Sequence, residues 1–137
     1  MESRPVEGVY GQLTTLALTE HRPALWKMVP PRLSDNPQAL VVTGNPNRVE
    51  AIRGLPLVGP DGATFRKSYL ERLGVGVGDV SIAHACPAVG ETTEAWAEWL
   101  DRLVDRHAGV PVIALGKQAS VALGDRDHTT LPHPRAV

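Results

Sequence analysis

Beyond residue 38, short apolar runs alternate with amphipathic stretches along the chain. Three runs, at 39–44, 80–86 and 110–116, are six or seven residues long and mostly apolar. Runs of this length are typical of strands that are buried on both faces, as in a parallel sheet covered by helices. A shorter, threonine-containing run at 128–131 predicts a fourth strand.

The stretches between these runs carry helical spacing. Residues 92–107 hold apolar side chains at positions i, i+3, i+4, i+7 and i+8, which line one face of a helix. A second helix is predicted from Asp61 to a stop at Gly74, and a short third helix from Lys117 to Leu123. The apolar face of the helix at 92–107 consists of Trp96, Trp99, Leu100, Leu103 and Val104.

Strands and helices thus alternate, which predicts an α/β fold. We expect a three-layer α/β/α domain over residues 39–137, with a central four-stranded, mostly parallel sheet and right-handed crossovers. Residues 1–38 are expected to form an N-terminal helix and a proline-rich connection. Ligands of such sheets bind beyond the carboxyl ends of the strands. The segments 44–48, 84–90 and 132–134 follow strand ends and are therefore expected to converge on one cleft.

Composition limits the classes of protein to which the chain can belong. Its 137 residues suffice for one domain with a buried core. Fourteen lysines and arginines balance fifteen aspartates and glutamates, so any contact with nucleic acid must come from a local patch. The single cysteine, Cys86, excludes an internal disulfide and a cysteine-based metal centre, and we expect no metal or other cofactor.

The apolar runs are too short for a membrane protein. None approaches the roughly 20 residues that span a bilayer, and the first residues lack the apolar core of a secretory signal. We therefore expect a cytoplasmic protein without membrane contact.

One histidine is held between two prolines near the end of the chain. Proline fixes its own φ and restricts the residue before it, so His133, between Pro132 and Pro134, has little backbone freedom. Its imidazole is expected to project from a rigid turn after the fourth strand, which suits a binding or catalytic role. A surface turn whose prolines merely end the strand explains the same residues.

Taken in order, five motifs resemble those of the uracil-DNA glycosylase superfamily, most of all its small bacterial and archaeal branch with an iron–sulfur cluster. The resemblance covers roughly residues 39–137, and its specificity lies in the ordered set rather than in any single motif. The motifs are a strand-end turn, a glycine-rich segment before a helix, a second strand end, an Ala-Leu-Gly strand end and a His-Pro pair. In this chain they read Gly44-Asn45-Pro46, Gly54-Leu55-Pro56-Leu57-Val58-Gly59, His84-Ala85-Cys86-Pro87, Ala114-Leu115-Gly116-Lys117-Gln118 and His133-Pro134-Arg135.

This resemblance implies hydrolysis of the N-glycosidic bond that joins a uracil-like or modified base to DNA. Such an enzyme extrudes the base from single- or double-stranded DNA into a pocket. The resemblance implies that His133 donates a hydrogen bond to the departing base and that Asn45 positions water, as the two catalytic residues. It further assigns substrate binding to Pro46, Leu57, Val58, Gly59 and His84, and DNA binding to Lys117, Gln118 and Arg135.

The chain differs from the family at several of these positions. Leu57 replaces the aromatic residue that stacks on the base, and His84 replaces the asparagine that reads its edge. The first turn lacks the catalytic acid, and Glu50, the nearest carboxylate, is expected to lie out of register. Arg135 replaces the serine of the His-Pro-Ser motif, and one cysteine stands where the branch has four, so no cluster can form.

Two other interpretations therefore stay open. A catalytically inactive module with this fold would bind nucleic acid or a protein partner, and the lost carboxylate, aromatic and asparagine favour it. A small α/β enzyme acting on free nucleotides would use the same strand-end cleft, and it would depend on a sugar phosphate rather than on a polymer.

Overall fold

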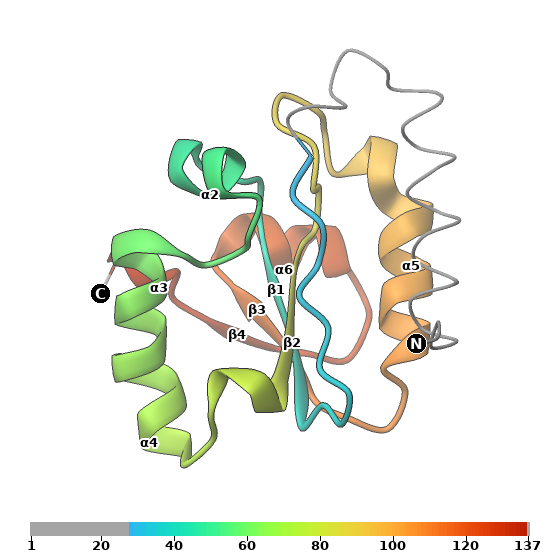
Figure 1. The fold of residues 1–137 in the computed structure, drawn as a ribbon. Coiled ribbons are helices and arrows are strands. Elements are labelled where there is room, and N and C mark those ends of the chain that lie inside the picture. The colour runs from blue at the N-terminus through green and yellow to red at the C-terminus, as the bar shows by residue number, and fades with distance from the viewer. Residues whose placement is uncertain (1–27, 137) are drawn as a thin grey trace.

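Residues 28–136 are described by the computed structural model of the chain, and four strands form its centre (Figure 1). The strands are β1 (Ala39–Thr43), β2 (Val80–His84), β3 (Val112–Leu115) and β4 (Thr129–Leu131). All neighbouring pairs are parallel, in the order β2-β1-β3-β4. The α/β prediction is confirmed, and the four strands are wholly parallel where the sequence predicted a mostly parallel sheet. The helix predicted before residue 28 lies outside the described residues.

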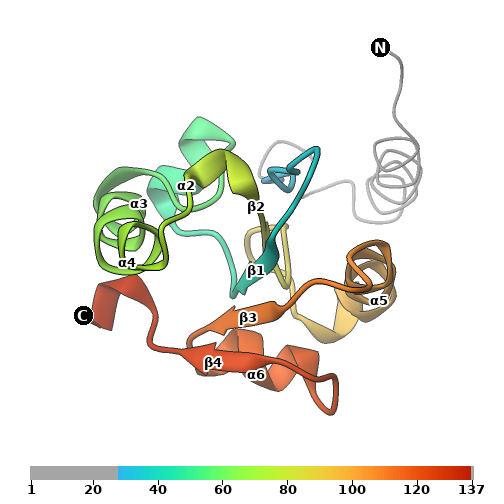
Figure 2. The same cartoon turned by 90° about the horizontal axis from the view of Figure 1, so that it is seen from below.

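Helices cover both faces of this sheet, so the predicted three layers are present (Figure 2). One face carries α2 (Arg48–Arg53) and a continuous helical segment made of α3 (Gly59–Phe65), a π-helical turn (Arg66–Leu70) and α4 (Glu71–Leu73). The opposite face carries α5 (Ala97–Arg106) and α6 (Lys117–Leu123). Short 3-10 turns lie at Val77–Asp79, Glu94–Trp96 and Pro134–Ala136. No helix of the described chain is long and apolar enough to cross a membrane.

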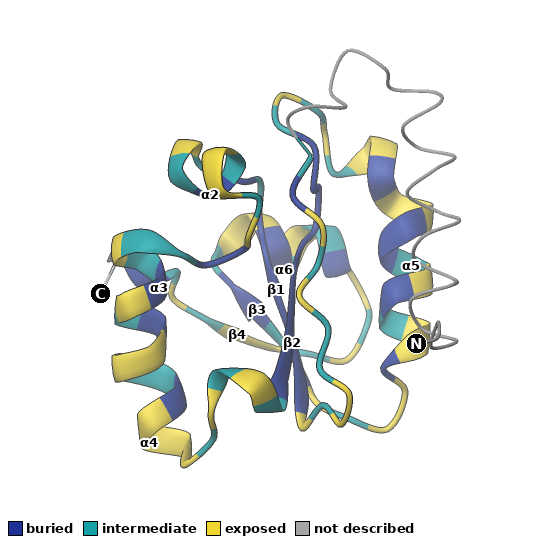
Figure 3. Ribbon diagram, in the orientation of Figure 1, coloured by how far each residue is buried: buried dark blue, intermediate teal, exposed yellow. Residues whose placement is uncertain are grey.

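The alternation of side chains along β1 divides the core into two parts. Leu40 belongs to the cluster under α5 and α6, whereas its neighbour Val41 belongs to the cluster that contains Phe65 of α3. In the first cluster the rings of Trp96 and Trp99 pack edge to face, with centroids 5.9 Å apart. Burial of one such large apolar side chain stabilises a fold by roughly 1.5–3 kcal/mol. All of β1 is buried between the two layers (Figure 3).

Residues 28–38 pack along the outer edge of β2. Arg32 and Ile82 exchange two backbone hydrogen bonds of 2.8 and 2.9 Å, and the N–H of Val29 donates to the carbonyl of Pro87 at 2.9 Å. The side chain of Val29 is fully buried. The described part of the region before residue 39 therefore belongs to the same packed unit as the sheet.

The turn predicted at 44–48 ends earlier than expected, because α2 begins at Arg48. The side chain of Asn47 accepts the N–H of Glu50 at 2.8 Å, and the Glu50 carboxylate accepts the N–H of Asn47 at 2.8 Å. This reciprocal capping box satisfies two N–H groups that the helix itself cannot pair. The Asn-x-x-Glu spacing is the sequence signature that identifies this helix start.

Candidate functional site

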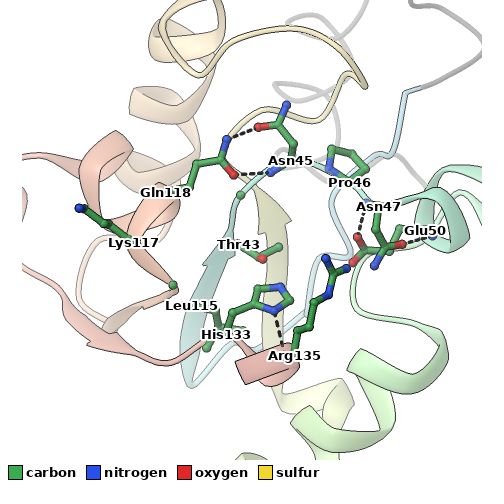
Figure 4. Close-up of a pocket in the computed structure, with 12 residues that line it drawn as sticks. Thr43, Asn45, Pro46, Asn47, Glu50, Leu115, Lys117, Gln118, His133 and Arg135 are labelled. Carbon is green, nitrogen blue, oxygen red and sulfur yellow. Dashed lines mark hydrogen bonds between the residues drawn. The ribbon is translucent and has the colours of Figure 1, made fainter. Parts of the chain in front are cut away.

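A cavity of about 480 Å³ opens at the carboxyl ends of β1 and β3 (Figure 4). This is the position at which open parallel sheets bind ligands, and the volume is typical of small-molecule sites. Three segments far apart in the chain form its wall. They contribute Thr43, Gly44, Asn45, Pro46, Asn47 and Glu50 from the region of β1 and α2, Leu115, Gly116, Lys117 and Gln118 from β3 and α6, and His133 and Arg135.

Six of the ten residues that the sequence assigned to a site line this cavity, and four do not. The segment 84–90 was expected to join the cleft, and this expectation was wrong. The reason is that Ala85 and Ala88 are fully buried and the N–H of Ala85 bonds to the carbonyl of Thr43, which turns the segment into the core. The six lining residues are Asn45, Pro46, Lys117, Gln118, His133 and Arg135; the four others are Leu57, Val58, Gly59 and His84.

The neutral ring of His133 is held in one tautomer. Its Nδ1 lies 3.1 Å from the backbone N of Arg135, whose N–H donates to it. A neutral imidazole carries one hydrogen, so that hydrogen is on Nε2, which is left as a donor. The hydroxyl of Tyr69 donates to the carbonyl of the preceding Pro132 and so fixes the turn. Burial raises the pKa of Tyr69, which keeps its hydroxyl protonated.

Gly116 allows the His133 turn to lie close to the end of β3. Its φ of +90° is strained for any residue with a side chain, and a Cβ at this position would lie 3.3 Å from Cβ of His133. Its N–H donates to the carbonyl of Leu131 at 2.8 Å. The glycine of the Ala-Leu-Gly motif therefore allows the close packing of the His133 turn beside the cavity.

Arg135 links the last turn of the described chain to α3. Its guanidinium group lies 3.2 Å from Oδ2 of Asp61, and the same oxygen accepts the side-chain amide of Asn47 at 3.2 Å. The Arg135 side chain is 66% exposed. Exposed ion pairs contribute roughly 0–1 kcal/mol, so another anion can compete with Asp61 for Arg135.

Asn45 has its polar side-chain atoms engaged within the protein. Its Oδ1 accepts the amide of Gln118, and its Nδ2 donates to the carbonyl of Glu91 at 3.0 Å. The backbone N–H of Asn45 in turn donates to Oε1 of Gln118 at 3.2 Å. Gln118 can lie there only because Gly44 has no Cβ, which would overlap the Gln118 amide oxygen. The residue expected to hold water is thus covered by Gln118 in this arrangement.

Glu50 lies in the wall of the cavity. From the sequence we expected this carboxylate to lie out of register with the site. It is 3% exposed, and its second carboxylate oxygen accepts the N–H of Leu57 at 2.6 Å. Leu57 has a φ of +50°, a strained value for a residue with a side chain, and this bond holds it. Burial, the largest effect, raises the pKa of Glu50, although its two backbone donors lower it. The capping-box spacing was the signal that could have placed this carboxylate.

The remaining assigned residues take other positions. The side chain of Leu57 is buried in the core with Phe65 and Leu70, so it does not stack on a ligand in the cavity. Val58 and Gly59 form the start of α3. Lys117 lines the cavity but its amino group points away from the centre in Figure 4.

His84 lies behind the cavity wall. It is 1% exposed, its Nδ1 donates to the carbonyl of Gly44 at 2.9 Å, and its Nε2 lies 3.6 Å from Oε2 of Glu50. Burial is the main cause that lowers the pKa of His84 to about 4. A neutral, buried ring in this position supports the wall and offers no edge to a base in the cavity.

The residues do not fit an iron–sulfur cluster. Such clusters are held by several thiolates, usually four. Cys86 is the only cysteine of the chain, it is buried, and its thiol donates to the carbonyl of Ala88 at 3.3 Å. Burial raises the pKa of this thiol to about 11, which opposes the thiolate form that metals require. Among residues 28–136, no group of three histidines, cysteines or carboxylates is placed to hold a metal ion.

Comparison with protein families gives a match that covers most of the chain. Residues 30–137 match the family model described as the Uracil DNA glycosylase superfamily. A comparison with curated proteins finds no match. The matched range contains all four strands and every residue that lines the cavity.

Proposed function

Because the chain belongs to the uracil DNA glycosylase superfamily, we propose that it hydrolyses the N-glycosidic bond of a uracil-like or modified base in DNA. The observation that carries this proposal is the orientation of His133. Its Nδ1 is occupied by the N–H of Arg135, so its Nε2 hydrogen is available at a cavity of about 480 Å³. The surrounding turn is held by prolines and by Tyr69, so the donor is positioned before a base arrives.

The chemistry of base removal explains why such a donor is useful. When the bond between the base and the sugar breaks, the electron pair goes to the base, and negative charge spreads onto its exocyclic carbonyl oxygens. A preorganised donor aimed at that charge stabilises the transition state, and one such donor contributes on the order of 3 kcal/mol. His133 supplies this donor in the proposed mechanism.

Attack by water on the sugar carbon is assigned to Asn45. Its side-chain oxygen would hold the water, whose oxygen bonds to the sugar carbon while its proton goes to the departed base anion. For this Gln118 must first move aside. Gln118 is exposed, so little packing opposes the movement. Glu50 is a less suitable base, because both of its oxygens accept backbone N–H groups.

We propose that DNA lies across the mouth of the cavity, where Arg135, Lys117 and Gln118 are exposed. Phosphate contacts position a protein on DNA, and the guanidinium group of Arg135 suits such a contact. A phosphate would then replace Asp61 as the partner of Arg135. The net charge of the chain is −1, so this local contact has to supply the attraction.

The test is a cleavage assay on labelled oligonucleotides that carry uracil, hypoxanthine, a thymine mispair or hydroxymethyluracil. Abasic sites are revealed by alkali. His133→Ala should reduce cleavage by roughly a hundredfold or more. His128→Ala, which lies away from the cavity, is the matched control and should keep the rate. Absence of cleavage on every substrate would contradict the proposal, and an unchanged rate in His133→Ala would remove His133 from the mechanism.

A second candidate function is a catalytically inactive module that binds nucleic acid or a protein partner. The observation that favours it is that the polar side-chain atoms of Asn45 and the carboxylate of Glu50 are bonded within the protein. Binding of DNA can be measured by fluorescence anisotropy. Measurable binding without cleavage of any oligonucleotide would support this candidate over the enzyme.

A further inference from the structure

Glu50 and His84 are two ionisable side chains buried next to each other beside the cavity. Their exposed fractions are 3% and 1%. Oε2 of Glu50 lies 3.6 Å from Nε2 of His84. Hydrogen bonds join heavy atoms at roughly 2.7–3.2 Å, so a displacement of less than about 1 Å would join these two atoms.

The ring of His84 leaves one nitrogen without a partner. Its Nδ1 lies 2.9 Å from the carbonyl oxygen of Gly44, which can only accept, so Nδ1 carries a hydrogen. In the neutral ring Nε2 is then a bare acceptor, and it is buried with no hydrogen-bond partner. Such a group has lost its hydrogen bonds to water without forming one within the protein, which is unfavourable.

The oxygen that faces Nε2 is an acceptor as well when Glu50 is ionised. Oε2 already accepts the N–H of Leu57 at 2.6 Å, and Oε1 accepts the N–H of Asn47 at 2.8 Å. Two acceptors that face each other repel, and one hydrogen between them would remove the repulsion and satisfy Nε2. Burial acts in the same direction, because it raises the pKa of Glu50 and lowers the pKa of His84.

Charged groups from two other elements face the pair. Asp61 of α3 further raises the pKa of Glu50, and Asp61 is itself paired with Arg135. His133, in the turn after β4, lowers the pKa of both Glu50 and His84 when it is charged. Neither Asp61 nor His133 supplies the hydrogen bond that Nε2 of His84 lacks.

We propose that the Glu50 carboxyl group is protonated in the folded protein and donates its hydrogen to Nε2 of His84. One proton then lies between the two side chains, and neither group is charged. The pair acts as a positioning device, because His84 holds the carbonyl of Gly44, which lines the cavity, and Glu50, which also lines it, holds the N–H of Leu57.

The neutral state of the pair has a consequence for the reaction, and this consequence alone rests on the proposed function. Glu50 lines the cavity in which a base would leave as an anion. An ionised Glu50, which is buried, would repel that anion, whereas a neutral carboxyl group would not. The proton itself can be tested without any DNA.

The test is an NMR titration of the folded protein labelled at histidine nitrogens and glutamate carboxyl carbons. We expect His84 to stay neutral from pH 7 to pH 5 with its hydrogen on Nδ1. We expect the Glu50 carboxyl carbon to titrate at a clearly higher pH than that of exposed Glu98. A Glu50 midpoint at or below that of Glu98, or a charged His84 ring at pH 6, would overturn the proposal.

Two substitutions distinguish the effect of a proton between Glu50 and His84 from the effect of packing between the two side chains. Glu50→Gln removes the titrating group and can place an amide donor beside Nε2, with loss of the bond to the N–H of Leu57, so in the folded variant the His84 nitrogen signals should stay those of a neutral, hydrogen-bonded ring at all pH values tested. Glu98→Gln is the matched control and should change nothing at His84. His84→Asn replaces the bare acceptor by a group that can donate, so the Glu50 midpoint should fall by about one pH unit or more. An unchanged Glu50 midpoint in His84→Asn would also overturn the proposal.

Discussion

The hydroxyl of Tyr69 donates a hydrogen bond to the carbonyl oxygen of Pro132, the residue before His133. Tyr69 lies in the helical turn between α3 and α4, so this bond ties one helical layer to the turn that follows β4. Gly116 approaches the same turn from the end of β3. The orientation of His133 therefore depends on residues from two distant parts of the chain.

Tyr69→Phe should loosen the His133 turn. The substitution removes one hydrogen bond and keeps the ring, so the free energy of unfolding should fall by about 1 kcal/mol. Urea denaturation measures this change. In an active enzyme, kcat should fall while KM changes little, because the donor stays present but is less well placed. Unchanged stability together with unchanged His133 NMR signals would contradict this prediction.

Gly116→Ala should disturb the site more than a comparable glycine substitution elsewhere. Both Gly116 and Gly109 have a φ near +90°, so alanine at either position carries a backbone strain of about 1–2 kcal/mol. A Cβ on Gly109 meets nothing within 4 Å, whereas a Cβ on Gly116 lies 3.3 Å from Cβ of His133. Thermal unfolding should therefore show a larger loss of stability for Gly116→Ala than for Gly109→Ala. Equal losses of stability in the two variants, with His133 unmoved, would show that the close approach of Gly116 to His133 is unimportant.

Acid should destabilise the protein through His84. Its folded pKa is about 4 against an ordinary value of 6.5, so the unfolded chain takes up this proton first. The corresponding stability is complete above pH 6.5 and is lost as the pH falls to about 4, which amounts to about 3 kcal/mol. The raised pKa of Glu50 acts oppositely, with stability lost as the pH rises through its folded pKa. Urea midpoints for the protein and for His84→Asn across this range measure the effect, and identical pH slopes would refute it.

Arg135→Ser should weaken DNA binding with little effect on folding. Its side chain is largely exposed, so the loss of its bond to Asp61 should cost under about 1 kcal/mol. If Arg135 contacts a phosphate, affinity should fall for every sequence, and the salt slope of binding should decrease by about one. Arg102→Ser removes an exposed pair with Glu98 on α5 and serves as the control. Equal affinities of the two variants would place the DNA elsewhere.

The strands and the two helices on the α5 face were predictable because their patterns are local. The apolar runs contain β1, β2 and β3, and the bounds predicted for the helix from Lys117 to Leu123 match α6. The position of the cavity followed as well, since parallel strands place their carboxyl ends at one edge. These features depend on periodicity within one segment and on a general property of parallel sheets.

The directions of single side chains were not predictable in the same way. His84 ends β2 in a register that turns its ring toward Gly44 and Glu50, and this depends on residues about 40 positions away. Gln118 covers Asn45 only because Gly44 lacks a Cβ. Such relationships arise from packing between elements, which a single sequence does not display.

The pairing of residues 28–38 with β2 affects the tendency of the protein to associate with other copies of itself. A sheet edge with free N–H and C=O groups invites strands from other chains and promotes aggregation. Here Arg32 occupies the outer edge of β2 through its two bonds with Ile82. At the opposite edge, β4 is only three residues long, and its Thr129 and Thr130 are exposed and polar. Within the described residues, the sheet thus offers no long apolar edge on which a second chain could begin to assemble.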